Sequence, residues 1–229
     1  YRTTVRYNFK TYYESVKTGK WQPWNPTIEM VLKEKKKPIP MYATDAQNEL
    51  ILPRSNAWCG FDMEVNDWVK PDGKGRHADV EFFLAWDGRR GVNYRGAVFN
   101  IRFPDKDAGC YSFTYGTKNQ TCELRSPYHA DPKRVYVQKL TFTDRKVGKW
   151  FRGGDIPQGT GYVFRTRTRF DDNGRLIGAF YGKVYAPPSY TFFPFRNGVS
   201  IRFPYYLNPT ENDTNLEYGW NLLKKKRVP

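Results

Sequence analysis

The chain has 229 residues, enough for one large β-sandwich or two small domains, and its composition shifts too little along the chain to force a division. Aromatic residues make up 17% of the chain, and their large side chains can fill a core although only 39% of the residues are hydrophobic. A net charge of +15 indicates an anionic partner, and the lack of any long apolar run excludes a membrane-spanning helix.

Residues 1–47 are expected to form a wrapping segment. Tyr1–Phe9 alternates apolar and polar residues like a strand, so a targeting segment or anchor upstream remains an open question. Residues 28–37 (IEMVLKEKKK) favour a short helix or basic arm, which Pro38 and Pro40 would close.

Residues 48–207 show the period of two that places alternate side chains on opposite faces of a sheet. The segments with this period are 61–65, 80–86, 97–103, 136–143 and 199–207, and Gly, Asp and Pro cluster between them. This pattern predicts a single antiparallel β-sandwich of the jelly-roll type with at most one or two short helices. Residues 208–229 are expected to be a polar, basic tail.

The clearest predicted hairpin runs from Tyr162 to Tyr185, with a turn at Asp172-Asn173-Gly174. Alternation places Arg165, Arg167 and Arg169 on one face, about 7 Å apart, a spacing suited to the charges of an extended acidic polymer. A three-residue loop would add Tyr181, Lys183 and Tyr185 to that face, whereas a two-residue loop would add Phe180 and Gly182. The alternative is a solvent face of arginines paired with neighbouring acids.

A resemblance to a known superfamily lies in the same region. Gly148-Lys149-Trp150, the strand Tyr162–Arg169, the Asn-Gly turn and the return strand Leu176–Tyr185 resemble the closing strands of concanavalin-A-like jelly rolls. That superfamily includes lectins, laminin-G-like modules, glycan hydrolases and polysaccharide lyases. The resemblance implies contact with a glycan and fixes no activity.

Three cysteines bear on the compartment. Cys110 and Cys122 flank a stretch that reads as a hairpin, so a disulfide between them is the leading pairing, while Cys59 reads as a buried free thiol. Such a disulfide would suit a secreted, periplasmic or cell-surface protein, and three reduced thiols would suit the cytosol. With two histidines and no CxxC motif, we expect no metal site and no cofactor.

The sequence carries no firm catalytic motif. The alternating acids of sandwich glucanases are incomplete, because Asp79 and Glu81 are followed on their face by Phe83 and Ala85. A polysaccharide lyase would need a group that neutralises a uronate carboxylate and a base that removes the adjacent proton. The candidates for these two tasks are Arg125, Tyr128, His129 and Gln138.

Three functions follow from these patterns. The first is a non-catalytic extracellular module, for binding or surface structure, that holds an acidic polysaccharide on a basic and aromatic sheet face. The second is a polysaccharide lyase of the jelly-roll type. The third is a nucleic-acid-binding or capsid-like β-sandwich whose basic segments Lys33–Lys37 and Lys224–Arg227 contact phosphates. Assembly into a homo-oligomer or a larger array stays open.

Overall fold

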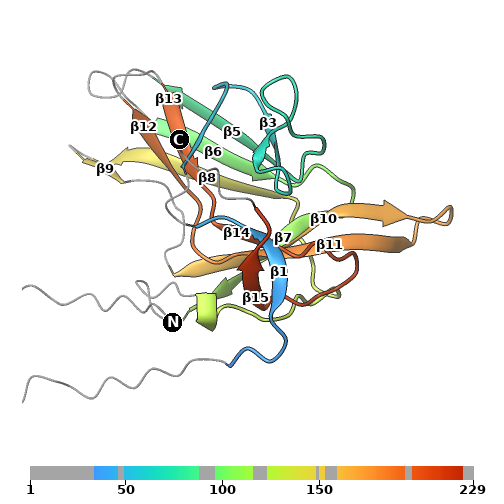
Figure 1. Cartoon of the computed structure of the whole chain (residues 1–229). Coiled ribbons are helices and arrows are strands. Elements are labelled where there is room, and N and C mark those ends of the chain that lie inside the picture. The colour runs from blue at the N-terminus through green and yellow to red at the C-terminus, as the bar shows by residue number, and fades with distance from the viewer. Residues whose placement is uncertain are drawn as a thin grey trace, which may run out of the picture. The chain divides into compact units, whose positions relative to one another are not determined.

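The computed structural model of the chain is all-β (Figure 1). It describes residues 34–45, 49–87, 96–115, 123–147, 150–152, 159–193 and 198–223. The chain divides into two compact units, residues 1–32 and 33–229, and every described residue belongs to the second. The predicted strand Tyr1–Phe9 lies outside the described residues, as do residues 28–33 of the predicted helix or arm. Residues 34–37 are not helical.

One six-stranded sheet, which we call sheet I, has the order β15-β1-β14-β11-β10-β7. Its strands are β15 (Tyr218–Asn221), β1 (Ile39–Ala43), β14 (Tyr205–Leu207), β11 (Leu176–Val184), β10 (Thr160–Phe170) and β7 (Gly109–Thr114). Its neighbours are antiparallel except β1 and β15, which are parallel. Strand β1 comes from the expected wrapping segment and β15 from the expected tail. The expected boundaries at residues 47 and 207 therefore cut through this sheet.

A second six-stranded sheet, sheet II, has the order β4-β3-β5-β6-β8-β9. It contains β4 (Asp67–Trp68), β3 (Cys59–Asp62), β5 (Val80–Asp87), β6 (Gly96–Arg102), β8 (Lys139–Val147) and β9 (Trp150–Arg152). A three-stranded sheet III is formed by β12 (Ser189–Phe193), β13 (Gly198–Arg202) and β2 (Glu49–Ile51), in the order β12-β13-β2. The described residues hold one helical turn, the 3₁₀ turn η1 (Glu123–Arg125), and no helix long and apolar enough to span a membrane.

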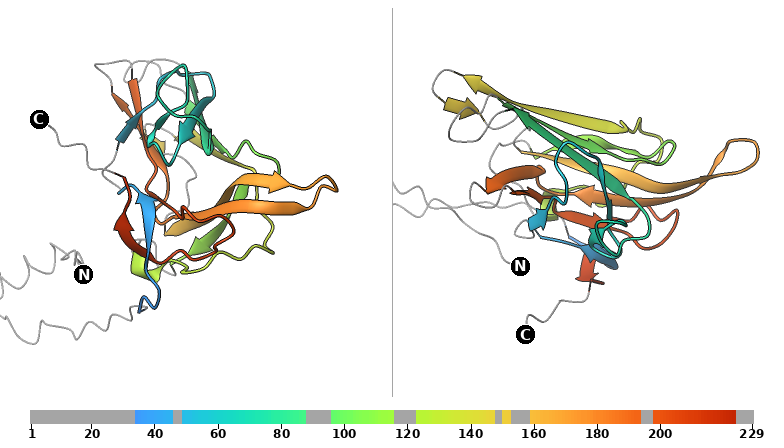
Figure 2. Two further views of the ribbon diagram at one scale, coloured as in Figure 1. Left: turned by 45° about the vertical axis from the view of Figure 1, so that its right-hand side comes forward. Right: turned by 90° about the horizontal axis from the view of Figure 1, so that it is seen from above.

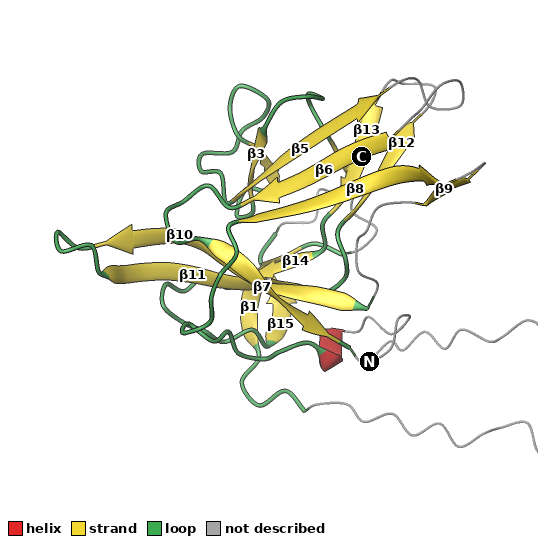
Figure 3. Ribbon diagram, turned by 180° about the vertical axis from the view of Figure 1, so that it is seen from behind, coloured by secondary structure: helices red, strands yellow, loops and turns green. Residues whose placement is uncertain are grey.

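The main core lies between the sheets, in a β-sandwich-like arrangement in which β5, β6 and β8 form one layer and β7, β10 and β11 another (Figures 2 and 3). Phe82 of sheet II, Phe164 of sheet I and Ile201 of sheet III are almost completely buried in it. Rings join the sheets: Phe61 lies 6.3 Å from Tyr205, centroid to centroid. These side chains face inward because alternate residues of a strand point to the same face of the sheet, which is the pattern that the sequence predicts.

Sheet I is also apolar on its outer face. A second core cluster there contains Met41, Val163, Tyr181 and Leu216, and residues 128–136 and 208–217 cover part of it. Because both faces are packed, residues 160–166 of β10 are buried without interruption. This outer face positions the lysine and tyrosines described below.

The predicted last strand, Val199–Leu207, is divided. Residues up to Arg202 form β13 of sheet III, whereas Tyr205–Leu207 form β14 of sheet I. Pro204 stands between them, and because proline has no N–H to donate, it interrupts a strand ladder. The break lets one segment serve two sheets.

Candidate functional site

The predicted row of three arginines does not form. Arg165 is buried, and its Nε and Nη2 donate hydrogen bonds to the carbonyl oxygen of Asp107 at 3.0 and 2.6 Å. Its guanidinium lies 4.2 Å from the centroid of the Tyr136 ring. Arg169 is exposed, but its Nε and Nη2 each donate to the Glu211 carboxylate at 2.7 Å. Arg165 is therefore closed to a polymer, and Arg169 is already paired with a carboxylate of the chain.

Arg167 leaves the row altogether. The register of β10 against β11 shifts between Thr166 and Arg169, and Arg167 has a φ of 51°. This bulge breaks the alternation and turns Arg167 toward sheet II. There it forms ion pairs with three carboxylates: Asp79 at 2.7 Å, Glu64 at 2.7 Å and Asp62 at 3.2 Å. The alternative of a solvent face of arginines paired with neighbouring acids fits Arg169 alone, because Arg167 is turned inward.

The other predicted residues of the hairpin do share one face. In the register of β10 against β11, Arg165 lies opposite Tyr181 and Val163 lies opposite Lys183. This is the register that the three-residue loop predicts. Tyr181 is buried and Tyr185 is half-buried on the outer face of sheet I. The structure thus brings Tyr181, Lys183 and Tyr185 together with Arg165.

Lys183 is the centre of this face, and its side chain is fully buried. Its Nζ donates a hydrogen bond to the Pro127 carbonyl at 3.2 Å and lies 3.6 Å from Glu123 Oε1. The ammonium also lies 5.5 Å from the Tyr128 ring and 5.6 Å from the Tyr206 ring. Burial lowers the pKa of Lys183 to about 8, although Glu123 opposes the shift. A buried amine that titrates near neutrality is a marker of functional sites.

Three rings pack in sequence on the same face, and we call them the tyrosine ladder: Tyr185, Tyr206 and Tyr218. Ring centroids are 5.1 Å apart between Tyr185 and Tyr206 and 4.6 Å apart between Tyr206 and Tyr218. Lys35 Nζ lies 5.5 Å from the Tyr218 ring and 3.0 Å from Glu123 Oε2. Glu123 therefore bridges two lysines, and its Oε1 is buried without a hydrogen-bond donor.

Two of the lyase candidates lie beside the ladder. Arg125 is exposed, and its Nη2 donates to the Tyr115 carbonyl at 3.1 Å, while the Tyr115 hydroxyl donates to the Tyr185 carbonyl at 2.5 Å. Tyr128 is half-buried with its ring near Lys183. Tyr128, predicted for one function, thus lies near Lys183, predicted for another, whereas Arg125 is linked to Tyr185 only through Tyr115.

The remaining two lyase candidates lie elsewhere. His129 is exposed and pairs through its backbone with Asn215. Gln138 donates through Nε2 to the Asp105 carbonyl at 3.3 Å, in the turn between β6 and β7. Gln138 does not join Arg125 and Tyr128.

Sequence reasoning missed four members of the site: Lys35, Glu123, Tyr206 and Tyr218. Lys35 belongs to the charge run Lys33–Lys37, which the sequence predicts only as a basic arm, and Glu123 is a single acid with no motif around it. Tyr206 and Tyr218 come from separate strands that flank β1 in sheet I. No local signal predicts that these strands meet.

The predicted disulfide is not formed. Cys110 is a buried free thiol whose pKa burial raises to about 12, and Cys122 lies outside the described residues. Strand β7 pairs with β10 on one edge, and on the other edge Cys110 exchanges two backbone hydrogen bonds with Val137. Both edges are occupied at Cys110, which leaves no place for the expected return strand. Cys59 is a buried free thiol, as predicted.

Comparisons with protein-family models, curated proteins and solved structures give no match to this chain. The described residues contain no group of three or more His, Cys, Asp or Glu side chains that could hold a metal ion. Inference about function therefore depends on the site geometry itself.

Proposed function

We propose that the chain binds an acidic polysaccharide on the outer face of sheet I, along the tyrosine ladder. One observation carries the proposal: three tyrosine rings contact one another in succession, with the ammonium groups of Lys183 and Lys35 within 5.6 Å of ring centroids. Sugar rings stack on aromatic rings, and their carboxylates pair with cations. Tyr185 and Tyr218 are half-buried and supply the reachable rings.

The charge of the site suits an anion. In the described part of the chain, the site holds the cations Lys35, Lys183 and Arg125 and the carboxylates Glu123 and Glu217. Lys183 is too buried to touch a polymer, so it acts from beneath, whereas Arg125 is exposed and is linked to Tyr185 through Tyr115. The guanidinium of Arg125 can hold a carboxylate or sulfate with two hydrogen bonds.

The same proposal includes the fold family and the compartment. We place the chain with concanavalin-A-like jelly rolls, because two six-stranded sheets enclose one aromatic core and the closing hairpin is present. An extracellular, periplasmic or cell-surface location follows from the ligand class, since acidic polysaccharides are found outside the cytoplasm.

Calorimetric titration with polygalacturonate tests the ligand class. We expect binding that weakens when the uronate carboxylates are methyl-esterified and that exceeds binding to a single-stranded DNA of equal charge. Tighter binding to the DNA, with a steep loss of affinity in salt, would favour the nucleic-acid alternative.

A lyase is the second candidate, because the amine of Lys183, whose pKa is about 8, lies 5.5 Å from the centroid of the Tyr128 ring. A half-protonated amine can exchange a proton with a base at neutral to alkaline pH. Turnover would release unsaturated ends that absorb ultraviolet light. Binding of polygalacturonate without this absorbance would support the non-catalytic module.

A further inference from the structure

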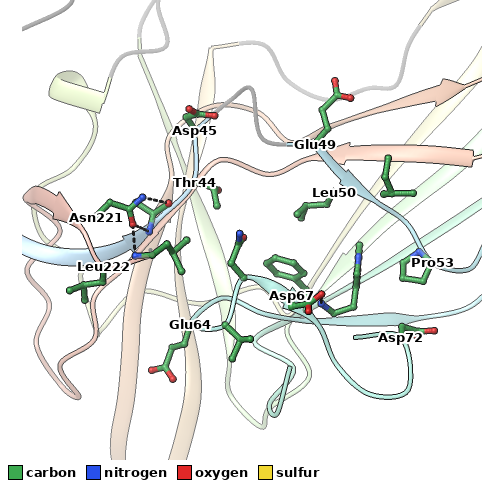
Figure 4. A pocket seen from close by; sticks show the side chains of 17 residues that line it. Thr44, Asp45, Glu49, Leu50, Pro53, Glu64, Asp67, Asp72, Asn221 and Leu222 are labelled. Carbon is green, nitrogen blue, oxygen red and sulfur yellow. Dashed lines mark hydrogen bonds between the residues drawn. The ribbon is translucent and has the colours of Figure 1, made fainter. Parts of the chain in front are cut away.

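A groove separate from the tyrosine ladder opens between β2, the β3–β4 turn and the end of β15 (Figure 4). Its volume is about 1140 Å³. Among the described residues, the lining contains five carboxylates and no lysine or arginine; the carboxylates are Asp45, Glu49, Glu64, Asp67 and Asp72. In a chain of net charge +15, these side chains make the described lining of the groove acidic.

Apolar side chains line the same groove. Ile51, Val65 and Leu222 on its walls are 55%, 40% and 37% exposed. Below them Phe61 and Trp68 are buried and form an aromatic floor. Exposed apolar walls within an acidic rim indicate a partner with both apolar and cationic groups.

The groove also borders an edge of sheet III. Among the described strands, β2 is the last of this sheet and pairs with β13 alone. Leu52 N donates to the Val199 carbonyl at 2.8 Å, so alternation turns the N–H and C=O of Ile51 away from β13. These backbone groups are the ones that an added strand would use.

Three of the carboxylates are held in place by arginines that do not line the groove. Glu49 pairs with Arg202, Asp72 with Arg54 and Glu64 with Arg167. A carboxylate accepts several hydrogen bonds, so such pairs orient the oxygens and leave further lone pairs for a ligand. Asp67 accepts from the backbone N–H of Trp68 and of Lys74.

We propose that this groove binds an extended cationic peptide segment of a partner protein. The segment adds a strand to β2 through the backbone of Ile51. It places apolar side chains over Trp68 and Leu222, and lysines or arginines against the acidic rim. Main-chain hydrogen bonds would supply affinity, while alternate side chains would supply specificity. This interaction is independent of the polysaccharide site.

Fluorescence anisotropy with a labelled Lys-Val-Lys-Val-Lys-Val-Lys peptide tests the proposal on the full chain. We expect saturable binding, which Ile51→Pro weakens about tenfold because a backbone donor is lost. Ile51→Val keeps the N–H and should bind as the unmodified protein does. The proline replaces an N–H that makes no ladder bond, so β2 should still pair with β13.

A second variant keeps the test decisive if Ile51→Pro does not fold. Val65→Lys places a positive charge on the groove wall, which repels the cationic peptide and should weaken its binding. Val135→Lys adds the same charge at a residue that is 82% exposed and lies outside the groove lining, so it should not weaken binding. Equal binding by Val65→Lys, or by a Glu-Val peptide, would overturn the proposal. A protein dimer that the peptide dissociates would also overturn it, since the occupant would then be a second copy.

Discussion

The guanidinium of Arg167 donates to both carboxylate oxygens of Asp79, at 2.7 and 2.9 Å, and Asp79 is fully buried. Burial raises the pKa of Asp79, and the hydrogen bond from Arg167 opposes that shift. Replacing Arg167 by Met would leave the carboxylate buried without its cation. We expect urea unfolding to report a loss of about 3 kcal/mol.

Arg169→Met is the matched control for Arg167→Met. Arg169 lies two residues further along β10, and its pair with Glu211 is exposed to solvent. Exposed pairs add little to stability, so this variant should unfold close to the unmodified protein. Equal losses of stability in the two variants would show that the buried ion pair of Arg167 contributes no more than an exposed one.

Lys183 predicts a stability that depends on pH. Its pKa is about 8 in the folded chain and lies at the ordinary lysine value of 10.5 in the unfolded chain. Between these values Lys183 binds more protons in the unfolded state, so it adds about 1 kcal/mol per pH unit to the free energy of unfolding between pH 8 and 10. Buried groups with a raised pKa, such as Cys110, act in the opposite direction, so the measurement is the difference between the unmodified protein and Lys183→Met, which should grow with pH in urea unfolding. Parallel curves would contradict the assignment of the low pKa to Lys183.

Because the described cysteines are free thiols, we expect reductant to leave the stability of the protein unchanged. Cys59 and Cys110 are buried thiols, and burial raises the pKa of both. We expect mass spectrometry to find both alkylated only after unfolding, because the thiolate is the reactive form. The melting temperature should be the same with and without reductant, and Cys122→Ser should not lower it. A lower melting temperature in reductant would restore the disulfide hypothesis.

Close packing beneath the site predicts that Gly182 tolerates no side chain. A Cβ at Gly182 would lie 2.2 Å from Cζ of Phe164 and 2.5 Å from the carbonyl oxygen of Tyr206. Overpacking of this kind destabilises by about 2 kcal/mol. Gly174→Ala is the control: its Cβ would meet nothing within 4 Å, and its cost should be the smaller one of a φ of 76°. Thermal unfolding that ranks Gly174→Ala as the more harmful would contradict this packing.

Much of the fold follows from the alternation of side chains. The segments 80–86 and 97–103 are β5 and β6, and the Asp-Asn-Gly turn joins β10 to β11. Alternation sets which residues face inward but not which strands become neighbours. The pairing of β1 with both β14 and β15 joins residues more than 160 positions apart. That pairing was therefore invisible in the sequence.

The candidate site shows the same limit. Arg165, Arg167 and Arg169 alternate without fault in the sequence, and the bulge at Arg167 reverses the face of one of them. Its cause is tertiary, because Asp62 and Asp79 of the opposite sheet attract the guanidinium. By contrast, the length of the hairpin loop alone decided which face Tyr181 and Lys183 occupy. The sequence therefore predicted part of the set of side chains on this face. It did not predict which of them are exposed and which are buried or paired.

Binding of polygalacturonate to variants of the tyrosine ladder tests the central claim most directly. Tyr185→Ala removes a ring of the ladder, and Arg125→Gln removes an exposed cation that Tyr115 links to Tyr185. Arg175→Gln removes an exposed arginine at the tip of the β10–β11 hairpin. The account predicts a loss of about tenfold in affinity for each of the first two variants and no loss for the third. Unchanged affinity in Tyr185→Ala and Arg125→Gln, measured by calorimetry on folded protein, would contradict it.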